Sequence, residues 1–191
     1  QWYTVQGGSR EYVTRLTESF RDHIRLGCGV SKVSRRDGKV YVTDERGEEH
    51  IYDRVVFACH ADQTLRLMED ADAAEKEVLG AFAYQDNRVV VHQDTSFMPR
   101  TRGCWASWIY LSENSIDRAP VVSLTYWMNN LQPLQTETPL LVTLNPGRRP
   151  QENSILDEHV FSHPVFTVAG LQAQQRLSEI QGRGNIWHCG A

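Results

Sequence analysis

The segment from Gly29 to Ala61, GVSKVSRRDGKVYVTDERGEEHIYDRVVFACHA, constrains the fold of this chain more than any other stretch. Apolar and polar residues alternate on both sides of Asp37-Gly38, and this pattern is a strong signal of a β-hairpin. A second turn at Arg46-Gly47 leads into a third strand, which ends in the continuous apolar run VVFAC. Such a run predicts a strand buried on both faces.

Helices are expected on both sides of these strands. REYVTRLTESFRDHIRL spaces its apolar residues mostly three and four apart, which predicts an amphipathic helix capped by Ser9 and ended by Gly27 and Gly29. Residues 61–82 predict two short helices, and residues 168–181 predict another. Residues 87–165 are rich in strand patterns joined by hairpins, with one helical turn before Pro133, and NIWHCGA predicts a last buried strand. The order predicts an α+β fold: a mixed, largely antiparallel sheet with helices packed on it.

The composition is that of a folded domain. The 191 residues suffice for a real core, and 23% charged with 40% hydrophobic residues argues against disorder. The net charge of −4 argues against a nucleic-acid partner, which requires a basic surface. No apolar run is long enough for a membrane span, so none is expected.

The four cysteines are far apart in the sequence and show no C-x-x-C spacing. We therefore expect reduced thiols and a cytoplasmic protein. The pairs Cys59-His60 and His188-Cys189 could in principle meet around zinc. Because adjacent residues of a strand point to opposite faces, this geometry is poor, and we expect no metal site.

The Gly7-Gly8 pair has two interpretations: a phosphate-binding loop, or simply the turn before a helix. Neither G-x-G-x-x-G nor G-x-x-x-x-G-K-S/T occurs in the chain, so a self-sufficient nucleotide loop is disfavoured. The chain begins at Gln1 without a signal sequence and stops just after a strand-like run. Both ends suggest a segment of a longer polypeptide.

The same residues resemble the flavin-containing amine oxidase superfamily. The shared pattern is Gly-Gly, a helix, a V-x-x-V strand, a V-x-V strand, a glycine turn and D-x-V-V-x-A, which here ends at Ala58. CWASWIY and LTYWMNNLQPL resemble a bacterial branch of FAD-dependent amine-oxidase-like proteins, and WHCGA resembles the start of a C-terminal flavin-binding motif. The resemblance covers nearly the whole chain and implies the middle of a flavoenzyme.

This resemblance implies three segments. Residues 1–60 would connect to a dinucleotide-binding unit carrying G-x-G-x-x-G, residues 61–182 would form the substrate side, and residues 183–191 would begin the C-terminal motif. The implied cofactor is FAD, which the parent protein binds and this piece alone does not retain. The implied cofactor-binding residues are Gly7, Gly8, Val30, Ala58, Cys59, His60 and Gly190. His60 stands where many relatives have proline, and Ala191 stands where many have an acidic residue.

The aromatic residues of the β-rich region are candidates for an apolar substrate wall or for plain core packing; they are Trp105, Trp108, Tyr126 and Trp127. Trp105 and Trp108 are three residues apart, so on one strand they would face opposite sides.

Two functions remain open. One is a flavin-dependent oxidoreductase that takes a hydride from a small or lipid-like substrate. The other is a non-catalytic module that binds an apolar molecule. In either case the surface exposed by truncation is expected to promote self-association.

Overall fold

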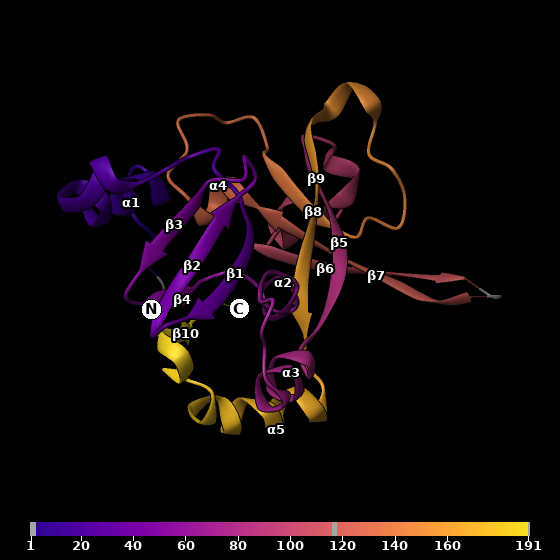
Figure 1. Ribbon diagram of the computed structural model, residues 1–191. Helices are drawn as coiled ribbons and strands as arrows, with labels where there is room; N and C mark the ends of the chain where they lie inside the picture. The colour runs from indigo at the N-terminus through magenta and orange to yellow at the C-terminus, as the bar shows by residue number, and fades with distance from the viewer. Residues whose placement is uncertain (1–2, 116–117, 191) are drawn as a thin grey trace. The chain divides into compact units, whose positions relative to one another are not determined.

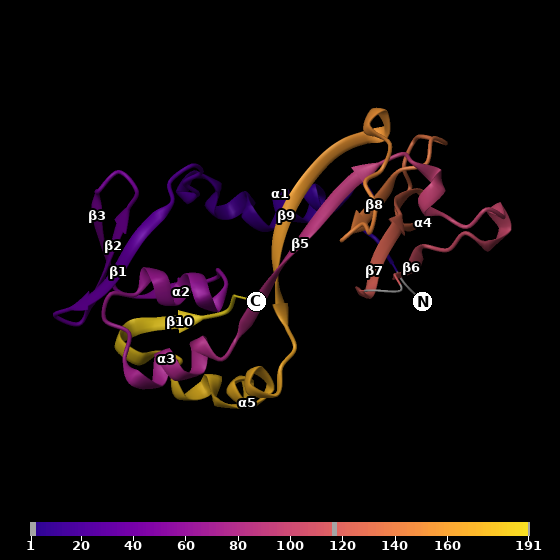
Figure 2. The ribbon, with the colours of Figure 1, turned by 90° about the vertical axis from the view of Figure 1, so that its right-hand side faces the viewer.

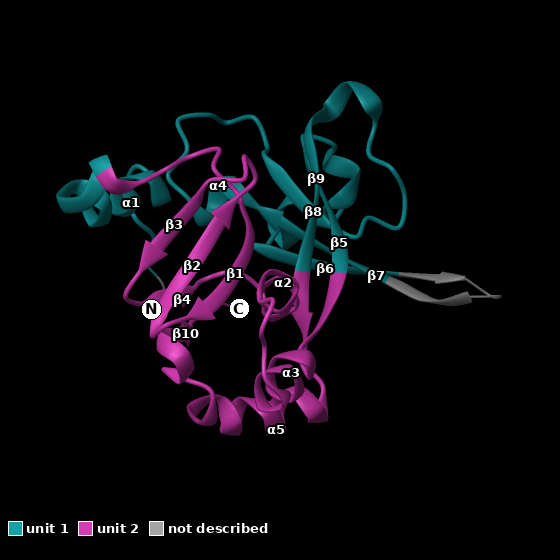
Figure 3. Ribbon diagram, viewed as in Figure 1, with its two compact units in different colours: residues 1–22, 86–162 teal, residues 23–85, 163–191 magenta. Residues whose placement is uncertain are grey.

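The computed structural model describes residues 3–115 and 118–190 (Figure 1). Contacts between Cα atoms divide the chain into two compact units (Figure 3). Unit 1 comprises residues 1–22 and 86–162, and unit 2 comprises residues 23–85 and 163–191. Helices combine with mostly antiparallel sheets, so the α+β prediction is confirmed. In the described part of the chain, no helix has the length and apolar character needed to cross a membrane.

Unit 2 contains the predicted hairpin. Strands β1 (Val30–Arg36), β2 (Lys39–Asp44) and β3 (Glu49–Tyr52) form a three-stranded antiparallel sheet. Asp37 and Gly38, between β1 and β2, have φ angles of 51° and 73°. Two consecutive positive φ angles are what a tight hairpin turn requires, and Asp-Gly adopts them at low cost.

The predicted third strand is in fact two strands in different sheets. After β3, residues 53–54 interrupt the pairing, and β4 (Val55–Phe57) runs parallel to β10 (Ile186–His188). The expectation that VVFAC is buried on both faces is wrong for one face, because Phe57 is 6% exposed but Val56 is 60% exposed. Phe57 packs into the apolar core of unit 2, whereas none of the described residues covers the opposite face of this sheet at Val56, which is unusual because parallel sheets are normally buried.

Helices pack against these strands to form the core of unit 2. The two short helices are confirmed as α2 (Ala61–Leu67) and α3 (Ala73–Gly80). Helix α5 (Val168–Arg176) continues into a 3₁₀ turn, η5 (Leu177–Glu179), and lies beside α3 (Figure 2). A further 3₁₀ turn, η6 (Arg183–Asn185), precedes β10. The buried apolar cluster consists of Val33, Val40, Phe57, Met68, Ala71, Val78, Leu79, Ala173, Ile180 and Ile186.

A buried ion pair joins β1 to α3 within unit 2. The Arg35 guanidinium donates to both carboxylate oxygens of Glu75, at 2.7 and 2.9 Å. The Glu75 side chain is fully buried, and it also accepts from the backbone N–H of Asp72 at 2.8 Å. Arg35 reaches Asp70 as well, so one side chain links the sheet to the loop before α3.

Unit 1 is built on a five-stranded sheet in the order β6-β7-β8-β5-β9. The strands are β5 (Ala83–His92), β6 (Trp108–Ser115), β7 (Arg118–Trp127), β8 (Leu141–Leu144) and β9 (Ile155–Val165). The helical turn predicted before Pro133 is α4 (Met128–Leu131). Three 3₁₀ turns complete the unit: η2 (Thr95–Phe97), η3 (Arg102–Cys104) and η4 (Glu152–Ser154). β6 and β7 pair as a hairpin, as expected.

A buried polar chain crosses the centre of this sheet. His92 Nδ1 accepts from the Asp94 backbone N–H at 3.1 Å, which leaves the ring proton on Nε2, 2.7 Å from Thr143 Oγ1. Thr143 Oγ1 in turn lies 2.8 Å from Thr125 Oγ1. Burial lowers the pKa of His92. The imidazole therefore acts as a neutral structural group.

The first helix is shorter than its apolar pattern predicts. α1 (Ser9–Thr17) gives way to the 3₁₀ segment η1 (Glu18–His23), where Phe20 has the non-helical φ of −133°. Ser9 is not the cap: the N-cap is Gly8, whose φ of 83° and ψ of −179° suit glycine. The apolar residues of the pattern are 40–89% exposed; they are Tyr12, Val13, Leu16, Phe20, Ile24 and Leu26.

Candidate functional site

The carboxyl ends of β4 and β10 bring four of the predicted cofactor residues together. The Cys189 N–H donates to the Phe57 carbonyl at 2.9 Å, which extends the parallel pairing past both strands. Gly190 then lies directly against Cys59: a Cβ on Gly190 would sit 1.7 Å from the Cys59 carbonyl oxygen. Ala58, Cys59, His60 and Gly190 therefore form one strand-end region in unit 2. Ligands of open sheets with parallel strands bind outside such carboxyl ends.

The loop after β4 is held in place by side chains. The His60 ring stacks on the Tyr84 ring with centroids 4.5 Å apart. The Tyr84 hydroxyl oxygen accepts from the backbone N–H of Ala61 at 2.8 Å, and Gln63 Oε1 accepts from that of His60 at 3.2 Å. The loop is thus fixed where it meets α2. Sequence reasoning did not identify Tyr84, whose only signal is its strand pattern.

A cavity of about 290 Å³ opens beside this region, within unit 2. Its wall is mainly apolar, with contributions from α3, α5 and the segment after β9; those residues include Leu79, Phe82, Val165, Phe166, Leu171 and Leu177. Cys59, Tyr84, His188, Cys189 and Gly190 supply its polar and backbone lining. A mainly apolar cavity with a few converging polar groups is the usual form of a small-molecule site.

His188 is the unusual group in this wall. Its ring lies parallel to that of Phe57, with centroids 5.8 Å apart and an interplanar angle of 4°. Both ring nitrogens are buried and have no hydrogen-bond partner among the described residues. Burial lowers the pKa of His188, so the imidazole is held neutral. A sequence alone does not reveal an unpaired buried imidazole, because its neighbours are set by the strand pairing.

Replacing His188 with phenylalanine is expected to raise the free energy of unfolding by about 1 kcal/mol, because it removes an unsatisfied buried polar ring of similar shape. Because the pKa of His188 is lowered in the folded state, the unfolded chain binds a proton at a higher pH than the folded chain does. The free energy of unfolding therefore decreases as pH falls below about 6.5, the ordinary pKa of histidine. Urea denaturation between pH 5 and 8 should show a flatter profile for H188F. His163→Gln, at an exposed position, is the control and should leave the profile unchanged; a loss of stability in H188F at pH 7.5 would contradict this prediction.

The other predicted cofactor residues lie elsewhere. Val30 begins β1 in unit 2, is 38% exposed and pairs with Asp44. Gly7 and Gly8 belong to unit 1 and have φ angles of 85° and 83°, so they form the turn that leads into α1. A role of these three residues in cofactor binding stays a prediction.

The four predicted substrate-side aromatics form two edge-to-face pairs in unit 1. Trp105 and Trp127 have centroids 5.2 Å apart, and Trp108 and Tyr126 have centroids 6.5 Å apart. The expectation that Trp105 and Trp108 share a strand is wrong, because Trp105 follows the η3 turn and Trp108 begins β6. Trp105 Nε1 donates to the Pro99 carbonyl at 2.8 Å, a contact that links the end of the η3 turn to the residues before it.

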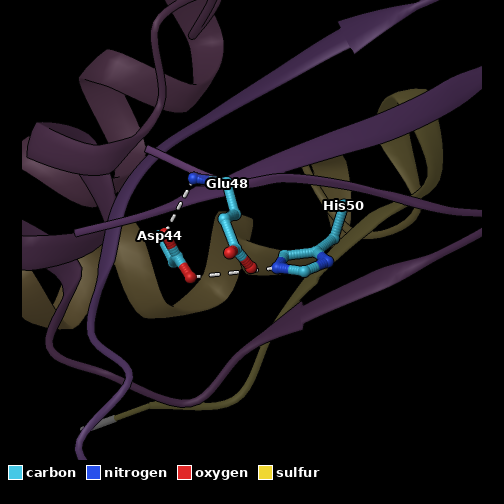
Figure 4. Close-up of side chains that lie close together, drawn as sticks. All are labelled: Asp44, Glu48 and His50. Carbon is cyan, nitrogen blue, oxygen red and sulfur yellow. Dashed lines mark hydrogen bonds and ion pairs between the residues drawn. The ribbon is translucent and has the colours of Figure 1, made fainter. Parts of the chain in front are cut away.

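Asp44, Glu48 and His50 place three ligand-type atoms within 4.8 Å of one another at the β2–β3 turn (Figure 4). Asp44 Oδ1 accepts from the backbone N–H groups of Arg46 and Glu48, both at 2.9 Å. Both hydrogen bonds lower the pKa of Asp44, and the bond from Glu48 has the larger effect. His50 Nε2 lies 3.3 Å from the Arg25 guanidinium, a fixed cation that opposes a metal ion. The cluster of Asp44, Glu48 and His50 therefore stabilises the β2–β3 turn.

The four cysteines are free thiols in the structure. Cys104 and Cys189 are exposed, and Cys59 Sγ lies 3.3 Å from Thr64 Oγ1 at the first turn of α2.

The family model of flavin-containing amine oxidoreductases matches residues 1–152. The chain therefore belongs to the flavin-containing amine oxidoreductase family.

Solved structures show the same fold. A CLA-producing fatty acid isomerase from P. acnes is similar, with a TM-score of 0.61 and 14% identity over 96% of this chain and 47% of that chain. Putrescine oxidase bound to putrescine has a TM-score of 0.60 and 13% identity, over 97% of this chain and 47% of that chain. Cyclohexylamine oxidase from Brevibacterium oxydans has a TM-score of 0.57 and 10% identity, over 96% of this chain and 47% of that chain. The chain thus spans about half the length of these proteins. No curated protein sequence matches the chain.

Proposed function

We propose that this chain is part of an FAD-dependent oxidoreductase in which a small or lipid-like organic substrate gives up a hydride to the flavin. The observation that carries the proposal is the junction of Cys59 and Gly190 at the carboxyl ends of β4 and β10, in a chain of this family. The remaining length of the family's proteins would supply the unit that carries G-x-G-x-x-G.

The residues at the strand ends fit a flavin. Gly190 has no side chain, and the backbone of Cys59 fills the place that a Cβ would take, so the two strand ends lie close enough together to offer one edge to a cofactor. Ala58, Cys59 and His60 form the facing edge, and Val30 and the Gly7-Gly8 turn are proposed to complete the contacts. The bound flavin would supply the redox chemistry, while the protein binds and orients the reactants.

The chain's own residues would then serve two purposes. Residues 1–60 and 183–191 would contact the cofactor, and residues 61–182 would face the substrate. In unit 1, Trp105, Trp108, Tyr126 and Trp127 are proposed to line the substrate side, because aromatic walls exclude water from a reacting C–H or C–N bond. By itself the chain is expected to be catalytically silent, because the unit that carries G-x-G-x-x-G would supply the rest of the cofactor site.

The visible absorption spectrum of two purified proteins tests this function. The complete polypeptide should be yellow, with flavin bands that bleach under a reductant, and the 191-residue chain should be colourless. A complete polypeptide that is colourless and ignores added FAD would refute the proposal. FAD that stays on the 191-residue chain through gel filtration would refute the division of the cofactor site.

The cavity in unit 2 favours one alternative: a module that holds an apolar molecule without chemistry. Its wall is mainly apolar and its volume of about 290 Å³ suits a small ligand. This alternative requires the isolated chain to bind an apolar probe such as 1-anilinonaphthalene-8-sulfonate at the cavity. Loss of that binding in Leu171→Asp, with the fold retained, would support it, and no binding at all would exclude it.

Self-association of the isolated chain is also proposed. Exposed apolar side chains of unit 2 include Val56 at 60%, Phe166 at 87%, Val168 at 72% and Leu171 at 53%. Patches of this kind promote association unless a partner covers them. A single monomeric species in light scattering across a range of concentrations would rule this out.

A further inference from the structure

We propose that Arg102, Trp105 and Trp127 form a binding site for the carboxylate of an organic ligand. The inference rests on the proposed function in one respect: it makes that ligand a carboxylate-bearing substrate. The three side chains form a compact group in unit 1. The planes of the two indoles are nearly perpendicular, at 87°, and the Arg102 guanidinium carbon lies 3.7 Å from the Trp105 ring centre and 4.6 Å from that of Trp127.

Stacking fixes the guanidinium but leaves its hydrogen-bonding capacity unused. The N–H groups of a guanidinium lie in its plane, so the donors on the side away from the two rings stay open to a ligand. Among the described residues, no carboxylate lies within 4.0 Å of Arg102 and no hydrogen bond involves its side chain. Arg149 in the same unit is different, because it pairs with both Glu152 and Glu158. Arg102 is thus an oriented cation whose donors are available to a ligand.

A second donor without an acceptor lies in the same group. Trp127 Nε1 is buried and has no hydrogen-bond partner in the described part of the chain. Trp105 Nε1 donates to the Pro99 carbonyl, so of the two indole N–H groups only that of Trp127 lacks an acceptor. The guanidinium lies over the Trp127 ring, and the Arg102 side chain is exposed to solvent. A carboxylate held by Arg102 would then supply the acceptor that this indole N–H lacks.

The geometry selects an anion rather than a cation. A corner of two indoles attracts cations, but here Arg102 already occupies it. An incoming ammonium group would have to displace a guanidinium of the same charge. A carboxylate meets no such barrier: its two oxygens match the paired donors of a guanidinium, and this bidentate pairing is among the stronger hydrogen-bonded contacts in proteins.

Calorimetric titration of the complete polypeptide with hexanoate tests the site. Hexanamide has the same shape without the charge, hexylammonium has the opposite charge, and inorganic phosphate is a different oxyanion. Hexanoate should bind more tightly than the other three. Arg102→Gln should weaken hexanoate binding about tenfold or more, because it removes the charge-assisted bonds. Arg100→Gln is the matched control, since Arg100 is exposed two residues away, and it should leave binding unchanged.

A second measurement reads the site directly. In a ¹⁵N-labelled sample, the indole N–H resonance of Trp127, assigned by its loss in Trp127→Phe, should move downfield as hexanoate is added. Equal hexanoate binding by the wild type and Arg102→Gln would overturn the proposal. Preferential binding of hexylammonium would identify a cation site instead, and equal binding of phosphate would remove the assignment to carboxylates.

The flavin spectrum of the same samples separates the two proposals. A yellow protein that does not bind hexanoate would refute the carboxylate site and leave the proposed oxidoreductase standing. A colourless protein that still binds hexanoate through Arg102 would refute the proposed oxidoreductase and leave the carboxylate site standing.

Discussion

Replacing Glu75 with alanine is expected to lower the free energy of unfolding by about 3–5 kcal/mol, which is the cost of breaking a buried ion pair by removing one partner. Arg35 would be left in the interior of unit 2 with Asp70 as its remaining carboxylate partner. The Asp72 backbone N–H would lose its acceptor at the start of α3 as well. Urea denaturation at pH 7 measures the change.

Two further variants show whether charge or shape is responsible. Glu75→Gln keeps the shape and one acceptor, so it should destabilise the protein less than Glu75→Ala. Glu77→Gln removes a carboxylate from the same helix, but Glu77 is exposed and pairs with Arg176 at the surface, so its effect should be much smaller than that of Glu75→Ala. Equal effects of Glu75→Ala and Glu77→Gln would contradict the importance of burial.

Replacing Gly190 with alanine is expected to remove most of the flavin from the complete polypeptide. The new Cβ would lie 1.7 Å from the carbonyl oxygen, 2.6 Å from the carbonyl carbon and 3.0 Å from the nitrogen of Cys59. Because all three are backbone atoms, no side-chain rotation relieves the clash, and the ends of β4 and β10 must separate. Overpacking of this kind costs about 1–3 kcal/mol and displaces the backbone. The ratio of flavin to protein absorbance in purified samples measures the loss.

Gly80→Ala provides the matched control for this experiment. Gly80 ends α3 in the same unit, and a Cβ there would meet Leu65 at an ordinary 3.8 Å. Its flavin content should equal that of the wild type. If Gly190→Ala retained full flavin while its strand pairing was disturbed, the cofactor would have to lie away from these strand ends.

Local rules were sufficient where the conformation depends on neighbouring residues. Asp37-Gly38 forms the predicted turn because this pair tolerates positive φ, and that preference does not depend on distant contacts. The two helices after β4 have the predicted order, and α3 begins at a capping box of Asp72 and Glu75, whose signal is local. Family motifs also indicated Cys59 and Gly190, which follow the carboxyl ends of β4 and β10.

Local rules failed where the outcome depends on what an apolar surface packs against. The pattern from Tyr12 to Leu26 specifies an amphipathic helix, but helices owe most of their stability to packing. In the described chain this face stays exposed, and α1 ends at Thr17. The apolar run VVFAC likewise predicts burial on both faces, but only the face that carries Phe57 packs into the core, and Val56 is 60% exposed.

The sequence by itself determined the α+β class, the Asp37-Gly38 hairpin and the resemblance to the family. Those features depend on backbone preferences and on residue patterns that are contiguous in the chain. Only the tertiary structure decided that β4 pairs with β10, that His188 has no hydrogen-bond partner and that Arg102 stacks on two indoles without a carboxylate. Each of these depends on residues brought together from distant parts of the chain, and their contacts are set by packing that no local pattern encodes.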